Sequence, residues 1–216
     1  MICLAPRALE DIVRPRRLAD VVVRPLSFTV RGQRMDAPTV LSALEGAFPL
    51  KPLPSMSLHE RALADQSLSR TISEEERAAA SRADAGRTWK EFTDEELIAC
   101  DAALGHLDDE SFVYYLPAFL RFAVRHCNVQ WGHPAWPLLG TAIFSVTHHK
   151  SDHSLRRYKR LSAAQREAVV SFLEFISQKA SPENASRAQK SIARYWKTPK
   201  ASEPLPSSPN NRWRGP

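Results

Sequence analysis

The 216-residue sequence has few cysteines, and their placement excludes a disulfide-stabilised fold and a cysteine-based metal site. Its three cysteines are Cys3, Cys100 and Cys127, and none has the CxxC spacing of a zinc ligand pair. Because Cys100 and Cys127 lie among apolar residues, we expect both to be buried, reduced thiols. Reduced cysteines fit a cytoplasmic location.

Long apolar runs and recognisable catalytic motifs are also missing. No run approaches the roughly 20 apolar residues that span a bilayer, so we expect no membrane association. The start of the chain lacks the apolar core, about 7–15 residues long, of a secretory signal. No GxSxG, P-loop or GxGxxG motif is present. We therefore favour a non-enzymatic protein and predict no cofactor.

Positive charge is concentrated at the two ends of the chain, whose formal net charge is +6. Residues 1–34 hold seven Arg and three acidic residues, and residues 179–216 hold eight basic and two acidic ones. The middle is mildly acidic. Because nucleic-acid binding needs clustered cations on a folded face, we do not expect it here. The alternative is RNA contact by a C-terminal set: Trp196, Lys197, Lys200, Arg212, Trp213 and Arg214.

Proline and charge patterns divide the chain into three parts. Residues 1–34 read as an irregular basic extension, and we hypothesise that Met35 rather than Met1 is the native start. Residues 35–197 carry helical periodicity and read as one helical domain. Residues 198–216 are rich in proline and serine and predict a disordered tail.

The most informative segment is Phe112–Val124, which is apolar except for Arg121. A helix that is apolar on every side cannot lie on a surface, so this segment should be the buried centre of an all-α, bundle-like domain. Asp108 is its expected N-cap. Pro117 predicts a kink, or a break with a second helix starting there.

Capping residues and apolar spacing predict further helices around this centre. A helix should start at Thr39, another should run from Thr93 to Gly105, and a third should follow Pro137 and carry Leu138, Leu139, Ile143 and Phe144. The last should follow Ser181, with one face formed by Ala185, Gln189, Ile192 and Trp196. The polar segment 147–160 reads as a loop or exposed edge. Three capping boxes are expected, at Ser73 and Glu76, Thr93 and Glu96, and Ser162 and Gln165.

Several of these segments resemble those of a known family. They are the central Tyr114–Leu120 (YYLPAFL), the later Leu161–Arg166 and Phe172–Phe175, the upstream Trp89, and Ala47–Pro49 before a proline-containing connector. Over residues 38–178 the chain resembles an uncharacterised bacterial domain family of unknown function. The resemblance implies a small, mostly helical, intracellular bacterial domain, and it supplies no catalytic residues to transfer.

Two groups of aromatic residues are candidate binding sites. Tyr114 and Tyr115 can clamp a ligand or donate a proton, although packing in the core is the favoured interpretation. Trp131 and Trp136 flank a Gly-Pro loop and can form a binding surface, although closing the end of a bundle is the favoured interpretation.

Three histidines are the candidate metal ligands: His148, His149 and His153. On a helix, His149 and His153 would share one face at i, i+4, with Asp152 nearby. Lys150 and neighbouring arginines would repel a cation, so a solvated polar loop is favoured. The sequence therefore predicts a protein-interaction domain with an unknown protein partner. The alternative is a metal-dependent hydrolase that uses these histidines.

Overall fold

The regular elements of the chain are helical. The computed structural model describes residues 35–67 and 70–198, and within them it contains ten α-helices, one 3-10 turn and one π turn, with no strand. This confirms the predicted all-α fold. The predicted extension over 1–34 and the tail from residue 199 onward lie outside the described residues.

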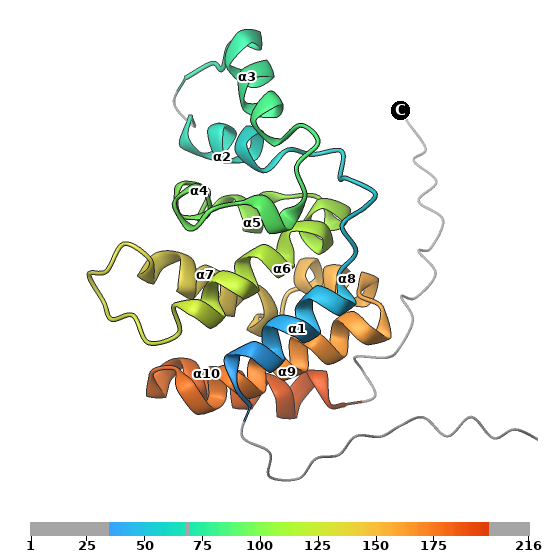
Figure 1. Ribbon diagram of the computed structural model, residues 1–216, viewed down its shortest axis with the longest axis vertical. Helices are drawn as coiled ribbons and strands as arrows, with labels where there is room; N and C mark the ends of the chain where they lie inside the picture. The colour runs from blue at the N-terminus through green and yellow to red at the C-terminus, as the bar shows by residue number, and fades with distance from the viewer. Residues whose placement is uncertain (1–34, 68–69, 199–216) are drawn as a thin grey trace, which may run out of the picture. The chain divides into compact units, whose positions relative to one another are not determined.

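The elements follow one another as shown in Figure 1: α1 (Ala37–Ala47), α2 (Leu58–Gln66), α3 (Glu74–Asp84), η1 (Trp89–Glu91), α4 (Asp94–Ala99), α5 (Ala103–His106), α6 (Asp109–Arg125), α7 (Trp136–Thr147), α8 (Asp152–Arg160), α9 (Ala163–Lys179), α10 (Pro182–Ser191) and the π turn η2 (Ile192–Trp196).

Helix α6 is the centre of the domain, as the apolar segment predicts. It packs against α1, α4, α5, α7, α8, α9 and η1, and Figure 1 shows it passing between α1 and α7. Twelve of its seventeen residues are buried. Its one mid-helix charge, Arg121, donates hydrogen bonds to the carbonyls of Lys90 (2.9 Å) and Phe92 (3.1 Å). These two hydrogen bonds fix η1 against α6.

Of the two alternatives predicted at Pro117, a kink or a break, the break is wrong, because α6 runs continuously from Asp109 to Arg125. An interior proline removes one backbone donor and costs about 3 kcal/mol in an isolated helix. Here Pro117 is buried and its neighbours pack on several helices. Tertiary packing supplies most of the stability of a protein helix, and we attribute the continuity of α6 to it.

Local capping signals are confirmed where their partners are close in sequence. All three predicted capping boxes form, and Asp108 caps α6 by accepting a hydrogen bond from the Ser111 N–H at 2.7 Å. The expected start at Thr39 is wrong. Asp36 is the N-cap and accepts a hydrogen bond from the Thr39 N–H at 2.9 Å. The expected helix from Thr93 to Gly105 is split after Ala99, and Gly105 lies inside α5.

The polar segment 147–160, expected to be a loop or exposed edge, is a loop only over residues 148–151; its second part, Asp152–Arg160, forms helix α8, which corrects the prediction there. Helix α8 buries Tyr158 and Arg157, and the Tyr158 hydroxyl donates a hydrogen bond to the Ser145 carbonyl at 2.8 Å. Arg157 donates to the carbonyls of Gly105 and Leu107 at the end of α5, and its guanidinium lies 4.6 Å from the centre of the Phe112 ring. A cation at a helix C-terminus is favourable. Helix α8 therefore has one face that packs on the domain, although most of its residues are polar.

The predicted face of the last helix is partly wrong. Gln189 is exposed, and the buried residues are Ala188, Ser191, Tyr195 and Trp196. The π turn η2 shifts the register of the final residues, and the Trp196 indole N–H donates to the Val146 carbonyl at 2.8 Å. Because Trp196 is buried, it is not free to stack on RNA as the C-terminal alternative requires.

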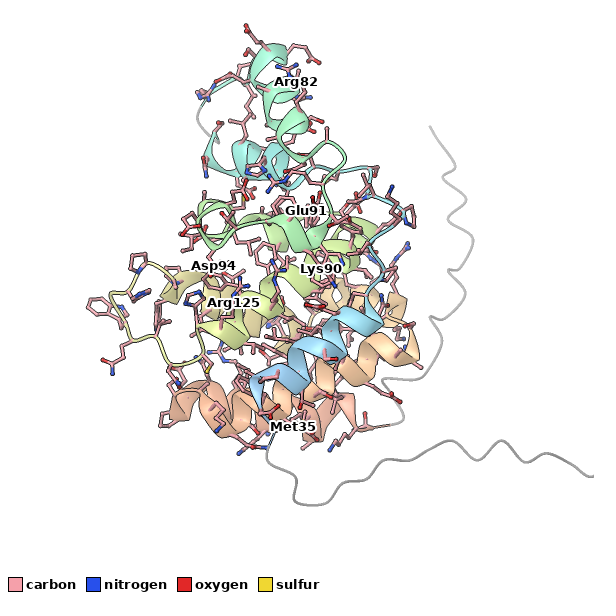
Figure 2. All side chains as sticks on the ribbon, viewed as in Figure 1. Met35, Arg82, Lys90, Glu91, Asp94 and Arg125 are labelled. Carbon is pink, nitrogen blue, oxygen red and sulfur yellow. The ribbon has the colours of Figure 1, made fainter. Side chains whose placement is uncertain are left out.

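Ion pairs join α4 to the end of α6. Asp94, the first residue of α4, pairs with the guanidinium of Arg125, as Figure 2 shows. Its second oxygen lies 2.7 Å from Nε2 of His126, which caps the end of α6. Within the described residues, no helix combines the length and the apolar character needed to cross a membrane.

Candidate functional site

The paired tyrosines lie in the core. Tyr114 is 8% exposed and Tyr115 is 3% exposed, and the two rings meet edge to face with centroids 5.1 Å apart. The Tyr114 hydroxyl donates a hydrogen bond to the Leu50 carbonyl at 3.0 Å. Burial raises the pKa of both phenols. These features fit the packing interpretation, and the Tyr114 hydroxyl also anchors the connector between α1 and α2 through Leu50.

Tyr114 also lines a small cavity beside this proline-rich connector. The cavity has a volume of about 130 Å³, and its walls include Phe48, Pro49, Pro52 and Val113. Ligand pockets usually have volumes of about 300–1,000 Å³. The cavity is therefore too small for most cofactors or metabolites.

The three candidate metal ligands do not share a helix face. Helix α8 begins at Asp152, so His149 precedes it and only His153 lies on it. The His149 ring stacks on Tyr195 with centroids 6.1 Å apart, and its Nδ1 lies 3.0 Å from the Thr147 carbonyl.

The other two histidines have different neighbours. The His148 ring stacks on Phe144 at 4.5 Å, and Nδ1 of His153 lies 3.3 Å from the Arg156 guanidinium. In the described part of the chain, no three His, Cys, Asp or Glu side chains are grouped as metal ligands. The geometry gives the hydrolase alternative no support.

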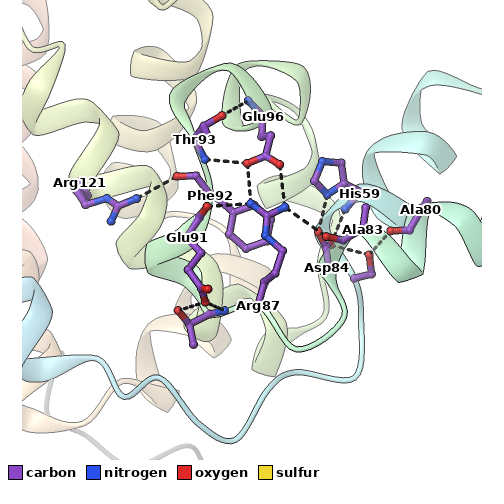
Figure 3. Close-up of polar contacts among 12 residues, drawn as sticks. His59, Ala80, Ala83, Asp84, Arg87, Glu91, Phe92, Thr93, Glu96 and Arg121 are labelled. Atoms are coloured by element: carbon purple, nitrogen blue, oxygen red, sulfur yellow. Dashed lines mark hydrogen bonds and ion pairs between the residues drawn. The ribbon is translucent and has the colours of Figure 1, made fainter.

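A buried carboxylate that the sequence did not reveal joins α2 to α3. Asp84 is only 8% exposed, and its Oδ2 accepts hydrogen bonds from the Ser57 hydroxyl (2.6 Å) and from the His59 backbone N–H (3.0 Å). Nδ1 of His59 lies 2.5 Å from Oδ1 of the same carboxylate. Figure 3 shows the imidazole beside the carboxylate. Asp84 ends α3 and Ser57 caps α2, so this group holds the two helices together.

An arginine continues this polar group toward α4. Arg87 donates two hydrogen bonds to the Glu96 carboxylate, at 2.7 and 2.8 Å, and its guanidinium lies 4.6 Å from the centre of the Phe92 ring (Figure 3). The Arg87 hydrogen bonds lower the pKa of Glu96 to about 2. The His59 ring stacks on the same phenylalanine at 6.0 Å. The network therefore fixes the α2–α3 pair to η1 and α4.

This network is not arranged for nucleophilic catalysis. An Asp–His pair activates a nucleophile through the second imidazole nitrogen. The Ser57 hydroxyl donates to Asp84, and within residues 35–67 and 70–198 no hydroxyl or thiol hydrogen-bonds Nε2 of His59. The Cys100 thiol is buried, as predicted, and burial raises its pKa to about 12, which keeps it protonated. We interpret the network as structural.

The two candidate tryptophans lie on the outside of the domain. Trp131 is 83% exposed, and Trp136, the first residue of α7, is 41% exposed. The expectation that they close the end of the bundle is therefore wrong. Phe144, two turns beyond Trp136 on α7, is 48% exposed. We call Trp131, Trp136 and Phe144 the aromatic surface.

Gly140 lies midway along α7 between the two exposed rings of this helix. Residues 136, 140 and 144 follow at intervals of four, which places them on one stripe of a helix. Apart from its chain neighbours and the backbone of α7 itself, a Cβ atom built on Gly140 would meet no atom within 4 Å. The opposite face of α7 is buried through Leu138, Leu139, Ala142, Ile143 and Val146. Helix α7 thus has apolar residues on its inner side and two exposed aromatic rings on its uncharged outer side, with open space beside Gly140 between them.

One sequence signal marks this surface. Residues 126–149 contain no Asp, Glu, Lys or Arg, although 25% of the whole chain is charged. An exposed helix normally carries charged residues on its solvent face, and α7 carries none. The apolar spacing alone assigned Phe144 to the buried side, because Ile143 and Phe144 are adjacent.

A comparison with known protein families assigns the chain to one of them. A family model described as a family of unknown function, DUF6714, matches residues 37–200. The chain belongs to the DUF6714 family. Neither the comparison with curated proteins nor the comparison with solved structures finds a match.

The DUF6714 match agrees with the resemblance to an uncharacterised domain family. It begins at the first residue of α1 and continues beyond η2, so it includes every described helix. The aromatic surface on α7 is therefore part of the DUF6714 domain itself. It does not belong to either terminal extension.

Proposed function

We propose that this DUF6714 chain is a protein-binding domain whose contact surface is the aromatic surface. The observation that carries the proposal is the exposure of Trp131, Trp136 and Phe144 on a segment without charged residues. Exposed tryptophans are frequent energetic centres of protein interfaces. Burial of one large apolar side chain contributes about 1.5–3 kcal/mol, so covering three such rings gives a substantial gain.

The chemistry of the surface indicates the type of partner. A nucleic acid would need lysines or arginines beside the stacking rings, and residues 126–149 contain neither. A charged partner surface would lose hydration against this segment without gaining an ion pair in return. The partner that fits is a polypeptide that presents an uncharged, apolar helix face to α7.

A pair of charge-introducing variants tests the proposal. Leu50, in the connector after α1, is also exposed and serves as the matched control, because Leu50→Lys changes an apolar surface residue away from α7. Tagged full-length wild type, Phe144→Lys and Leu50→Lys are purified from the native source, and the co-purifying proteins are quantified by mass spectrometry.

The proposal expects at least one identified partner whose recovery falls about tenfold with Phe144→Lys, the loss typical of one important interface residue. Recovery with Leu50→Lys should equal that of wild type. Equal recovery of every co-purifying protein with all three chains would contradict the proposal.

A further inference from the structure

We propose that the outer side of α10 binds the phosphate backbone of a nucleic-acid duplex without recognising its sequence. The binding surface is formed by Arg187, Lys190 and Arg194, which we call the basic stripe. It is separate from the aromatic surface on α7, so the inference goes beyond the proposed function. Two observations lead to it: the separation of charge within the folded domain, and the exposure of unpaired cations on α10.

The folded domain has an acidic end and a basic end. Residues 58–110, which form α2 to α5 and the start of α6, hold 14 acidic and six basic side chains. Residues 111–198 hold four acidic and 13 basic ones. Figure 1 shows α2 and α3 at one end of the domain and α10 at the other. Such a separation of charge directs an anionic partner toward the basic end and away from the acidic one.

The three cations of the basic stripe lie on one side of the last helix. Arg187, Lys190 and Arg194 follow at i, i+3 and i+7, which places them on the same face. Lys190 and Arg194 are exposed and Arg187 is partly exposed, whereas Ala188 and Tyr195 are buried against the domain. The stripe therefore faces solvent along the length of α10.

The charge of the basic stripe is largely uncompensated. Arg187 pairs with Glu183 at 3.1 Å, and an exposed pair of this kind contributes little free energy, so a phosphate can replace the carboxylate. Lys190 and Arg194 form no ion pair with any residue that the structure describes. Residues 184–202 hold five cations and no acidic side chain. Two cations are thus free to contact phosphates, and a third is weakly held.

Helix α10 supplies a feature that the sequence alone did not reveal. We expected no nucleic-acid binding because the positive charge is concentrated in the two terminal segments, whereas binding needs cations on a folded face. The basic stripe is such a face. The terminal segments are also joined to the domain at this end, because Met35 lies there, as Figure 2 shows, and η2 directly follows α10.

The side chains around the basic stripe favour a nucleic acid over a membrane or a protein. In the described part of the chain the exposed large apolar residues are Leu50, Trp131, Trp136 and Phe144, and none of them lies on α10 or η2. A membrane-surface helix needs apolar side chains that insert into the lipid, and protein interfaces have an apolar centre. A phosphate backbone requires only cations.

The same surface favours a duplex over a single strand. Single-strand binders stack the bases on exposed aromatic rings, and the two aromatic residues beside the stripe, Tyr195 and Trp196, are buried. A duplex instead presents rigid rows of phosphates, with one charge per about 1.7 Å of its axis. The stripe spans seven residues from Arg187 to Arg194, which is about 10 Å of helix, so it can contact two or three phosphates.

The number of contacts predicts the strength and the salt dependence of binding. Binding without base contacts typically has a Kd of about 10⁻⁴–10⁻⁶ M at physiological salt. Each contact between a cation and a phosphate adds about 0.9 to the slope of log K against log salt. Three contacts should therefore weaken binding about 40-fold between 50 and 200 mM NaCl.

Fluorescence anisotropy of a labelled DNA duplex of about 20 base pairs, titrated with the full chain, tests the proposal. The test variant is the double substitution Lys190→Ala with Arg194→Ala. The matched control is Arg77→Ala with Arg82→Ala, which removes the same charge from exposed positions of α3 at the acidic end. The test variant should bind at least about tenfold more weakly at 50 mM NaCl, with a salt slope lower by about 2. The control should bind as wild type does.

Four results would overturn the proposal. Wild type could fail to bind the duplex at 50 mM NaCl, or all three chains could show equal affinity and salt slope, which would assign the binding to the terminal segments. The labelled single strand could bind more tightly than the duplex. Vesicles of phosphatidylserine and phosphatidylcholine could bind the chain more tightly than the duplex does. None of these results bears on the proposed function, because that proposal is tested at Phe144 on α7.

Discussion

Nδ1 of His59 lies 2.5 Å from Oδ1 of Asp84, although the two residues are 25 positions apart in the sequence. The Ser57 hydroxyl and the His59 backbone N–H also donate to this carboxylate. Helix α3 packs mainly on α2, and Asp84 is the buried residue of α3, so this carboxylate is the main buried polar contact between the two helices. A buried charge with three donors is expensive to remove, which makes Asp84 a sharp probe of the fold.

Asp84→Ala should lower the free energy of unfolding by about 2–3 kcal/mol, because it leaves buried donors without an acceptor. Urea denaturation followed by circular dichroism measures the change. Glu75→Ala in the first turn of the same helix is the control, because Glu75 is exposed. It should change stability by less than about 0.5 kcal/mol. Equal effects of the two substitutions would show that Asp84 does not hold α3 in place.

The same pair predicts a pH dependence of stability. The hydrogen bond that His59 donates to the Asp84 carboxylate raises the pKa of His59, while burial opposes the shift. A raised histidine pKa contributes stability that is complete below the unfolded-state value of about 6.5 and is lost as the pH rises through the folded-state value. The contribution of His59 should therefore be largest near pH 5–6 and smaller near pH 9.

The Asp84 carboxylate determines the pH below which this stabilisation is lost. Burial by itself raises the pKa of Asp84, but donation by His59 and Ser57 outweighs it and the pKa is lowered. Its contribution is present above the unfolded-state value of about 3.9 and is lost as the pH falls through the folded-state value. His59→Asn keeps a donor but does not titrate. The difference in unfolding free energy between wild type and His59→Asn should shrink from pH 6 to pH 9, and a constant difference would refute the assignment.

Alanine substitutions at two glycines should change the stability of the protein in opposite directions. Gly140 lies inside α7 with open space around it, so Gly140→Ala should raise the stability of the dilute protein by about 0.5–1 kcal/mol. Gly86 has a φ of +75°, a conformation that costs a residue with a side chain about 1 kcal/mol. Gly86→Ala should therefore lower stability. Thermal unfolding of both variants, compared with wild type, checks the signs.

Alanine substitutions of two tryptophans should change the free energy of unfolding by different amounts, because one tryptophan is buried and the other is exposed. Trp89 is fully buried, and its indole N–H donates to the Pro49 carbonyl at 3.3 Å, so Trp89→Ala should cost about 3–5 kcal/mol. Trp131→Ala should change the stability of the monomer by less than about 0.5 kcal/mol. Urea denaturation provides both values. A large loss of stability with Trp131→Ala would mean that this residue supports the fold and is not free to bind a partner.

Sequence reasoning succeeded where the deciding contacts are local. The pairs Ser73 with Glu76 and Ser162 with Gln165 are three residues apart, so their spacing alone predicts the helix starts. The apolar run around Phe119 identified the central helix for a similar reason, because its composition leaves no polar face.

Contacts between distant segments could not be predicted in this way. The sequence of α8 predicts a polar loop. The helix is stabilised by contacts that the sequence does not reveal, because Arg157 donates to carbonyls at the end of α5, about 50 residues earlier in the chain. His59 and Asp84 carry no recognisable spacing. Phe144 was assigned to the core because apolar character does not reveal which side of α7 the neighbouring helices cover.

Hydroxyl-radical footprinting tests most directly the claim that the aromatic surface is covered by protein. Oxidation of Trp131, Trp136 and Phe144 is compared between intact cells and the dilute purified chain, with exposed Leu50 as the internal reference. The account predicts strong oxidation of all three aromatic residues in the dilute chain and clear protection in cells, with Leu50 unchanged. Equal oxidation of the three residues in both settings would contradict it.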